Sequence, residues 1–171
     1  MPREIRIAPP VPARIAGGWR VEADVDGRPV WFECGDVPLA ASPEAFASAF
    51  LLPSLAQRRP LVSAAPLDGA WIENAPRLVE IFHRWWRYPR LVPRCAADPV
   101  PLPPVAAPRE RAAFFSGGVD SFHTLLHLGE RIDRLVFVVG FDIPLGDATR
   151  AEASLASIWT IAELEIGRAH V

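Results

Sequence analysis

Alternating hydrophobic and polar positions near the N-terminus predict a β-hairpin. Apolar residues alternate with acidic ones over 21–25, and Asp26-Gly27 then supplies the residue pair that two-residue hairpin turns favour. We therefore expect a hairpin over residues 19–34. Because Pro29 cannot donate a backbone hydrogen bond, the second strand is expected to lie at a sheet edge or to begin late.

Helical periodicity predicts two helices after the hairpin. The first begins at Ser42, as its cap, with Pro43 at the first helical position, and it ends or kinks at Pro53. The second runs from Asn74, as its cap, to about Arg87. The residues expected to face a core are Phe46, Ala49 and Phe50 in the first helix, and Leu78, Phe82 and Trp85 in the second.

A proline-rich stretch predicts where the chain divides. Residues 93–110 contain Asp-Pro-Val-Pro-Leu-Pro-Pro, which is extended and stiff, so we interpret this stretch as a linker. Residues 1–92, with a further short strand at 61–62, then form a small α+β module for which no motif indicates a role. Residues 111–165 form a second domain.

The second domain shows the order strand, helix, strand, helix. An apolar run at 112–115 has the character of a buried strand, and a helix follows that ends near Gly129. The β-branched run at 134–140 predicts a buried parallel neighbour, reached by a right-handed crossover, and 147–165 predicts a helix that packs on the sheet. The fold class expected is therefore α/β. The expected packing residues are Phe122, Leu125, Leu126, Leu128, Ala151, Leu155, Ile158, Trp159, Ile161, Ala162 and Leu164.

The turn between the first strand and helix of this domain has the chemistry of an anion site. Residues 116–121 read Ser-Gly-Gly-Val-Asp-Ser. Glycine lets a phosphate approach backbone N–H groups, and the helix dipole favours negative charge there. The stretch lacks the lysine of a Walker A loop and the spacing of the dinucleotide fingerprint. A purely structural turn, with Asp120 or Ser121 capping the helix, is the alternative.

The same six residues resemble the S-G-G-x-D-S signature of the PP-loop ATP pyrophosphatases, in the strand–loop–helix context of that family. The family includes amide-forming synthetases and 7-cyano-7-deazaguanine synthase. The resemblance implies a PP-loop parallel sheet and an ATP-binding, adenylating ligase. Such an enzyme cleaves ATP to AMP and pyrophosphate to activate a carboxylate, amide or carbonyl acceptor.

The resemblance also implies site residues and cofactors. ATP and Mg²⁺ would be bound, with Asp120 and Ser121 as catalytic residues and Asp120 as the magnesium ligand. Backbone at Gly140 and Phe141 would contact adenine, and Asp142 would meet ribose or metal, or only cap its loop. Members of that family that thiolate tRNA often carry paired cysteines, and amidotransferase members carry a glutaminase domain. The chain shows no C-x-x-C pair and no evident glutaminase triad, so the resemblance implies a small-molecule or nucleobase-like acceptor. The residues expected to hold the phosphates are Ser116, Gly117, Gly118, Val119, Asp120 and Ser121.

Net charge and hydrophobicity restrict the binding partners and the cellular location that we expect. The formal net charge is −2, which argues against bulk binding to nucleic acid or membranes. No apolar signal segment or membrane-spanning run is present, so we expect a cytoplasmic protein. Two other functions stay open. One is a nucleotide-binding module without turnover; the other is an RNA-modifying or RNA-binding protein that uses the arginine–aromatic run at 84–90, unless that run is simply a packed helix end.

The last six residues, 166–171, read Ile-Gly-Arg-Ala-His-Val and resemble the translation of a common sequencing-adapter end. We therefore expect this tail to be non-native and the PP-loop domain to be C-terminally truncated. Two parallel strands do not complete an α/β domain, which leads to the same expectation. Under this interpretation the full-length form is an enzyme and the present fragment is inactive.

Overall fold

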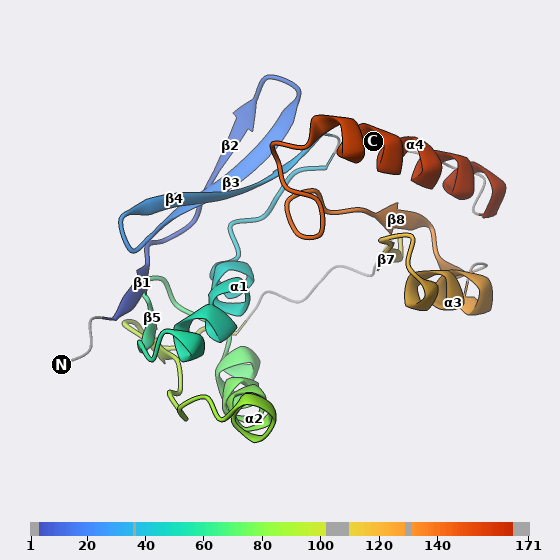
Figure 1. The fold of residues 1–171 in the computed structure, drawn as a ribbon. Coiled ribbons are helices and arrows are strands. Elements are labelled where there is room, and N and C mark those ends of the chain that lie inside the picture. Colours follow the sequence, from blue (N-terminus) through green and yellow to red (C-terminus); the bar gives the residue numbers. More distant parts are fainter. Residues whose placement is uncertain (1–3, 36, 102–109, 129–130, 166–171) are drawn as a thin grey trace. The chain divides into compact units, whose positions relative to one another are not determined.

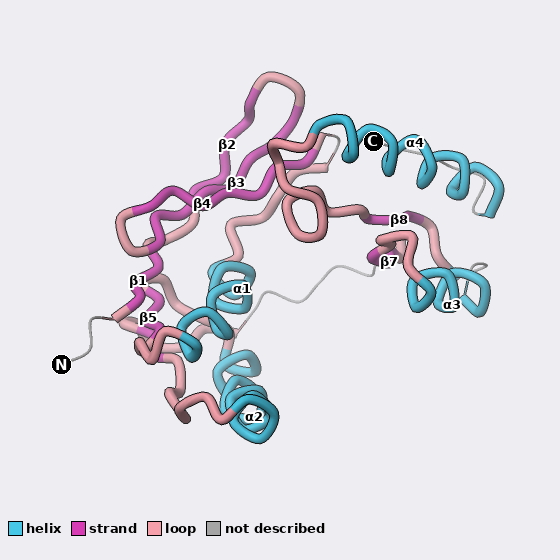
Figure 2. Tube along the Cα trace, viewed as in Figure 1, coloured by secondary structure: helices cyan, strands magenta, loops and turns pink. Residues whose placement is uncertain are grey.

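The computed structural model describes residues 4–35, 37–101, 110–128 and 131–165, and the chain forms two compact units, Met1–Pro104 and Val105–Val171. The protein is mixed α/β, with strands in both units and four helices among the described residues (Figure 2). Residues 102–109 of the expected linker and the whole of the expected non-native tail, 166–171, lie outside the described residues.

A mixed sheet forms the framework of the first unit (Figure 1). Strand β3 pairs antiparallel with β1, β2 and β4, while β5 lies parallel between β1 and β6. The short strand expected at 61–62 is confirmed as β5. The strands are β1 (Ile5–Ile7), β2 (Val11–Ile15), β3 (Gly18–Val25), β4 (Arg28–Cys34), β5 (Leu61–Ser63) and β6 (Arg94–Cys95).

The predicted hairpin is confirmed as β3 and β4. Its turn has φ of 57° at Asp26 and 82° at Gly27, the positive values that a type I′ turn requires at both central residues. The Asp24 carboxylate accepts a hydrogen bond from the Gly27 N–H at 2.9 Å and secures the turn. Among the described residues β4 pairs only with β3, so Pro29 lies in an edge strand, as expected.

Helix α1 (Pro43–Ala56) begins where predicted but differs in detail. It continues through Pro53 to Ala56, and Ser42 at its N-cap makes no capping hydrogen bond, because its hydroxyl donates to Glu44 at 2.8 Å. The expectation that Ala49 faces the core was wrong: Ala49 is exposed and Ala47 is buried in its place. Phe46 is fully buried, as expected.

Helix α2 (Gly69–Trp86) begins earlier than predicted. Its cap is Asp68, whose carboxylate accepts a hydrogen bond from the Trp71 N–H at 3.1 Å. Asn74 therefore lies inside the helix, where its side-chain amide donates to the Ala70 carbonyl at 2.7 Å. The helix ends at Trp86 and is closed by Arg87 in the left-handed conformation, close to the predicted end.

The face that α2 buries was predicted only in part. Ala75 and Val79 are buried and Phe82 packs beside them, whereas Leu78 is 44% exposed and Trp85 is 68% exposed. Both sets have helical spacing, and periodicity alone does not say which set meets the sheet. The core of the first unit comprises Ile5, Ile7, Val21, Ala23, Val25, Phe46, Ala47, Leu51, Leu55, Leu61, Leu67 and Val79.

The predicted order of strand, helix, strand and helix is confirmed in the second unit. Strands β7 and β8 are parallel, with Phe114 opposite Val136. The expected second strand over 134–140 is shorter than predicted and stops at Val136, after which the chain turns. The elements are β7 (Ala112–Phe114), α3 (Val119–Leu128), β8 (Arg134–Val136) and α4 (Ala148–Glu165).

One small hydrophobic cluster holds the second unit together. Phe115, Leu125 and Ile132 are buried, and both α3 and α4 contribute residues that pack against them. Successive strand residues face opposite sides of a sheet, so Ala113 joins this cluster while Phe114 points away and is 77% exposed. The expectation of buried strands was therefore wrong for this face. The same correction applies to Leu126, Leu128 and Leu164, which are exposed, whereas Ile158, Ile161 and Ala162 pack as expected.

Candidate phosphate-binding loop

The candidate site lies in the second unit, where β7 passes through a glycine-containing turn into α3. The Phe115 N–H donates to the Val136 carbonyl at 2.9 Å and joins the end of β7 to its parallel neighbour. The Phe115 ring is buried and meets the Phe122 ring of α3 edge to face, with centroids 5.1 Å apart. The turn is therefore fixed at both ends, by a backbone bond on one side and an aromatic contact on the other.

The backbone of the turn is open to solvent. Residues Ser116 to Asp120 are all exposed. Gly117 has a φ of +78°, a backbone conformation that residues other than glycine rarely adopt. A Cβ atom built at this position would meet no other atom within 4 Å. A ligand can therefore approach this backbone closely. Among the described residues, neither Gly117 nor Gly118 donates its N–H to a turn or loop carbonyl.

The start of α3 contributes further N–H groups. The first N–H groups of a helix have no acceptor within the helix, and the helix dipole places partial positive charge there. In α3 these groups belong to Val119, Asp120 and Ser121. The Val119 side chain is 86% exposed and covers none of the core. Together with the glycines, this end of the helix presents a row of donors suited to phosphate oxygens.

The alternative in which Asp120 or Ser121 caps α3 does not fit the geometry. Both residues lie inside the first helical turn rather than before it. The Ser121 hydroxyl donates to the Gly118 carbonyl at 2.7 Å, and the Phe122 N–H donates to the same oxygen at 3.0 Å. Ser121 thus stabilises the turn through a carbonyl, and its hydroxyl must rotate away from Gly118 before it donates to a ligand.

Asp120 has the exposure that a magnesium ligand needs. Its carboxylate makes no hydrogen bond or ion pair with any other described residue, and it stands in the first turn of α3, directly after the glycines. No group of three or more metal-ligating side chains occurs within the described ranges. A single carboxylate fits a Mg²⁺ ion that takes its remaining ligands from water and from substrate phosphates.

The residues expected beside adenine follow β8. Gly140 has φ of +104° and its N–H donates to the Ile143 carbonyl at 2.8 Å, which closes a tight turn. Ile143 is buried, whereas the Phe141 side chain is 73% exposed and Asp142 is exposed. Because β7 and β8 are parallel, this turn and the glycine loop both follow the carboxyl ends of their strands and lie at the same edge of the sheet.

Two ion pairs lie at the opposite edge. Arg134 pairs with Glu110, and Arg111 pairs with Asp133, whose carboxylate also accepts a hydrogen bond from the Arg111 N–H at 2.8 Å. Arg111 directly precedes β7 and Arg134 begins β8, so these cations stand at the amino ends of the strands. In the glycine loop itself, positive potential comes from backbone N–H groups rather than from arginine.

Comparisons with protein-family models, with curated proteins and with solved structures found no match to this chain. Within the part of the chain that the structure describes, no helix is both long enough and apolar enough to cross a bilayer. The assignment of the site therefore rests on its residues and their geometry.

Proposed function

We propose that the loop at residues 116–121 binds the phosphates of ATP and that the protein serves an adenylating ligase reaction. The observation that carries the proposal is the exposed turn between β7 and α3. There Gly117 takes a positive φ and the N–H groups of the turn and of the helix start are available to a ligand. This arrangement suits an anion with several oxygens, and the residues that form it read Ser-Gly-Gly-Val-Asp-Ser.

The proposed reaction transfers AMP to an acceptor. An oxygen of a carboxylate, amide or carbonyl attacks the α-phosphorus, a bond forms between them, and the bond from that phosphorus to the bridging oxygen breaks. Pyrophosphate leaves with the bond's electron pair. Backbone donors of Gly117, Gly118 and Val119 would hold the leaving pyrophosphate and stabilise its growing charge. The loop would act by positioning and electrostatics rather than by proton transfer.

Asp120 would hold Mg²⁺ against the phosphates. When bound, the ion would neutralise charge on the pyrophosphate. The exposed carboxylate of Asp120 supplies the oxygen ligand for this role, while the Ser121 hydroxyl would turn from the Gly118 carbonyl towards a phosphate oxygen. We assign the nucleobase to the turn at Gly140 and Phe141, at the same edge of the sheet. The acceptor would be a small molecule or a nucleobase-like one.

The first test is calorimetric titration of the 171-residue chain with pyrophosphate, AMP and ATP, each with and without Mg²⁺. We expect ATP and pyrophosphate to bind and AMP to bind more weakly, because the loop holds the β- and γ-phosphates. Asp120→Asn should remove most of the gain in affinity that Mg²⁺ gives. The matched control Glu152→Gln removes one exposed carboxylate from α4 in the same unit and should leave that gain unchanged.

Two results would contradict this proposal. One is that neither ATP nor pyrophosphate binds; the other is that Asp120→Asn and Glu152→Gln behave alike. A third result separates binding from catalysis. If ATP binds at the loop and the full-length form yields AMP and pyrophosphate with no candidate acceptor, the protein is a nucleotide-binding module, and only the ligase part of the proposal falls.

A further inference from the structure

The C-terminal end of α2 exposes two tryptophans that are flanked by arginines. Arg84, Trp85, Trp86 and Arg87 are all exposed, and we call these four residues the Trp–Arg patch. The Trp85 side chain is 68% exposed and that of Trp86 is 49% exposed. Tryptophan seldom presents so much ring surface to water when it has only a packing role. The patch therefore differs from the packed helix end that the sequence also allowed.

Neighbouring aromatic side chains hold the rings of the patch in place. Trp86 stacks at a tilt against Phe82, with centroids 5.6 Å apart, and against Tyr88, at 5.9 Å. Phe82 and Tyr88 both pack on the core of the first unit. Trp85 meets Trp86 edge to face at 5.4 Å. These aromatic contacts hold the indole rings in place. The protein would therefore lose little side-chain entropy when a ligand stacks on them.

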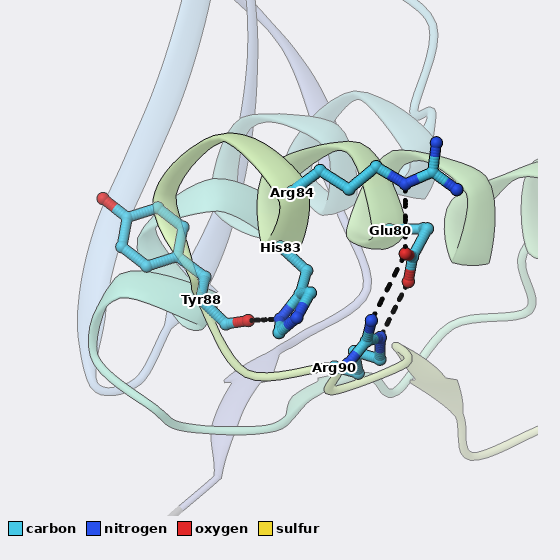
Figure 3. A network of polar contacts seen from close by, with 5 residues as sticks. All are labelled: Glu80, His83, Arg84, Tyr88 and Arg90. Atoms are coloured by element: carbon cyan, nitrogen blue, oxygen red, sulfur yellow. Dashed lines mark hydrogen bonds and ion pairs between the residues drawn. The ribbon is translucent and has the colours of Figure 1, made fainter.

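The segment of chain that carries these rings has an excess of positive charge, and its last arginine, Arg94 on β6, pairs with Glu4 at 2.7 Å. Residues 77–94 contain five arginines and a single acidic residue, Glu80, which gives a formal charge of +4 in a chain whose net charge is −2. Glu80 is shared by Arg90 and Arg84, at 2.7 Å and 3.2 Å (Figure 3). Arg77 and Arg87 pair with no acidic group among the described residues. An anionic partner therefore finds complementary charge at this surface.

We propose that the Trp–Arg patch is a docking site for single-stranded nucleic acid. Bases stack on exposed aromatic rings regardless of their sequence, and arginines contact the phosphates between them. A ligand that carries flat rings and negative charge matches a protein surface on which two exposed indoles are flanked in sequence by two exposed arginines. A lipid surface or an apolar helix would instead place its apolar part against Arg84, Arg87 and Glu80, which carry charge at the same surface. This proposal is independent of the phosphate loop, which lies in the other unit.

The test measures fluorescence anisotropy of a labelled oligouridylate of about 12 nucleotides, within the site sizes of known single-strand binders, mixed with the 171-residue chain. We expect binding at low salt that weakens by about five-fold or more in Trp86→Ala and in Trp85→Ala. Trp31→Ala is the matched control, because Trp31 is also a half-exposed tryptophan of this unit, on β4, and it should leave affinity unchanged. An oligothymidylate of equal length shows whether RNA or DNA is preferred.

Salt dependence tests the arginines separately. For single strands the slope of log affinity against log salt changes by about 0.7 for each phosphate contact. Arg87→Gln should reduce the slope by about that amount, while Arg28→Gln, at the start of β4, should not. The proposal is overturned if no oligonucleotide binds at low salt or if Trp31→Ala weakens binding as much as Trp86→Ala. It also falls if phosphatidylglycerol vesicles bind at the patch and oligonucleotides do not, or if the patch instead joins two copies of the chain in sedimentation experiments.

Discussion

At the scale of single residues, Glu80 shows how two cations fix an exposed carboxylate. Arg90 donates two hydrogen bonds to it and Arg84 donates one from the same helix, four residues on (Figure 3). The hydrogen bond from Arg90 is the largest cause that lowers the pKa of Glu80 from its usual 4.5 to about 2. The raised pKa of Arg90 reflects the same pair.

This pKa gives a prediction for acid titration. Because the folded-state pKa lies below the ordinary value, the interaction is complete above a pH of about 4.5 and is lost as the pH falls towards 2. The carboxyl carbon of Glu80, followed by NMR, should titrate near pH 2. Arg90→Gln should raise that midpoint. Arg77→Gln, which removes an unpaired arginine of the same helix, should leave it in place, and an equal shift in both variants would refute the assigned cause.

At the level of helices, both helix starts of the first unit have a residue type that favours the N-cap position, but the two caps differ in structure. Ser42 and Asp68 each take the N-cap position, but only Asp68 accepts a hydrogen bond from a helix N–H. Glu44 of α1 links the two starts, because it accepts from the Ser42 hydroxyl and from the Asp68 N–H, each at 2.8 Å. The two N-cap residues should therefore contribute unequally to the free energy of unfolding.

Alanine substitution tests this inequality. Asp68→Ala should lower the free energy of unfolding by about 1 kcal/mol, the usual cost of losing a cap hydrogen bond. Ser42→Ala removes no cap hydrogen bond, so its effect should stay below about 0.5 kcal/mol, as is normal for sites without such a bond. Thermal unfolding followed by circular dichroism would measure both. Equal losses would show that Ser42 caps α1 in solution.

The elements also show which features the sequence could predict. The hairpin was predictable because its signal is local: strict alternation followed by Asp26-Gly27, which adopts the required positive φ values. The start of α2 was not, because Asp68 caps the helix six residues before Asn74, the residue that resembles a cap in the sequence. Its exposed face was not predictable either, because Leu78 and Trp85 have the same helical spacing as residues that are buried.

The candidate site was predicted at the level of residues, and the structure adds its geometry. The order of strand, turn and helix around Gly117 followed from an apolar run, two glycines and a helical pattern. That Phe114 is exposed and β8 is short depends on what covers the sheet, which no local pattern encodes. The hydrogen bond from Ser121 to the Gly118 carbonyl was equally invisible in the sequence, and it changes how Ser121 would act.

In the molecule as a whole, each of the two units carries a different kind of exposed surface. The second unit carries an exposed turn lined by backbone donors, and the first carries exposed indoles among arginines. The net charge of −2 for the whole chain conceals this division, because residues 77–94 alone carry five arginines and a single acidic residue. Composition alone therefore argued against nucleic acid, whereas the local distribution of charge supports it as the partner of the Trp–Arg patch.

If the turn at 116–121 holds phosphate, the amide groups that contact the ligand should change their chemical shifts. In a ¹⁵N-labelled sample of the 171-residue chain, titration with pyrophosphate and Mg²⁺ should shift the amide signals of Gly117, Gly118 and Val119 most strongly. Gly18 and Gly27, which lie in the hairpin of the first unit, serve as reference signals and should stay in place. Signals at 117–119 that do not move at saturating pyrophosphate, or that move no more than the reference signals, would show that this turn does not hold phosphate.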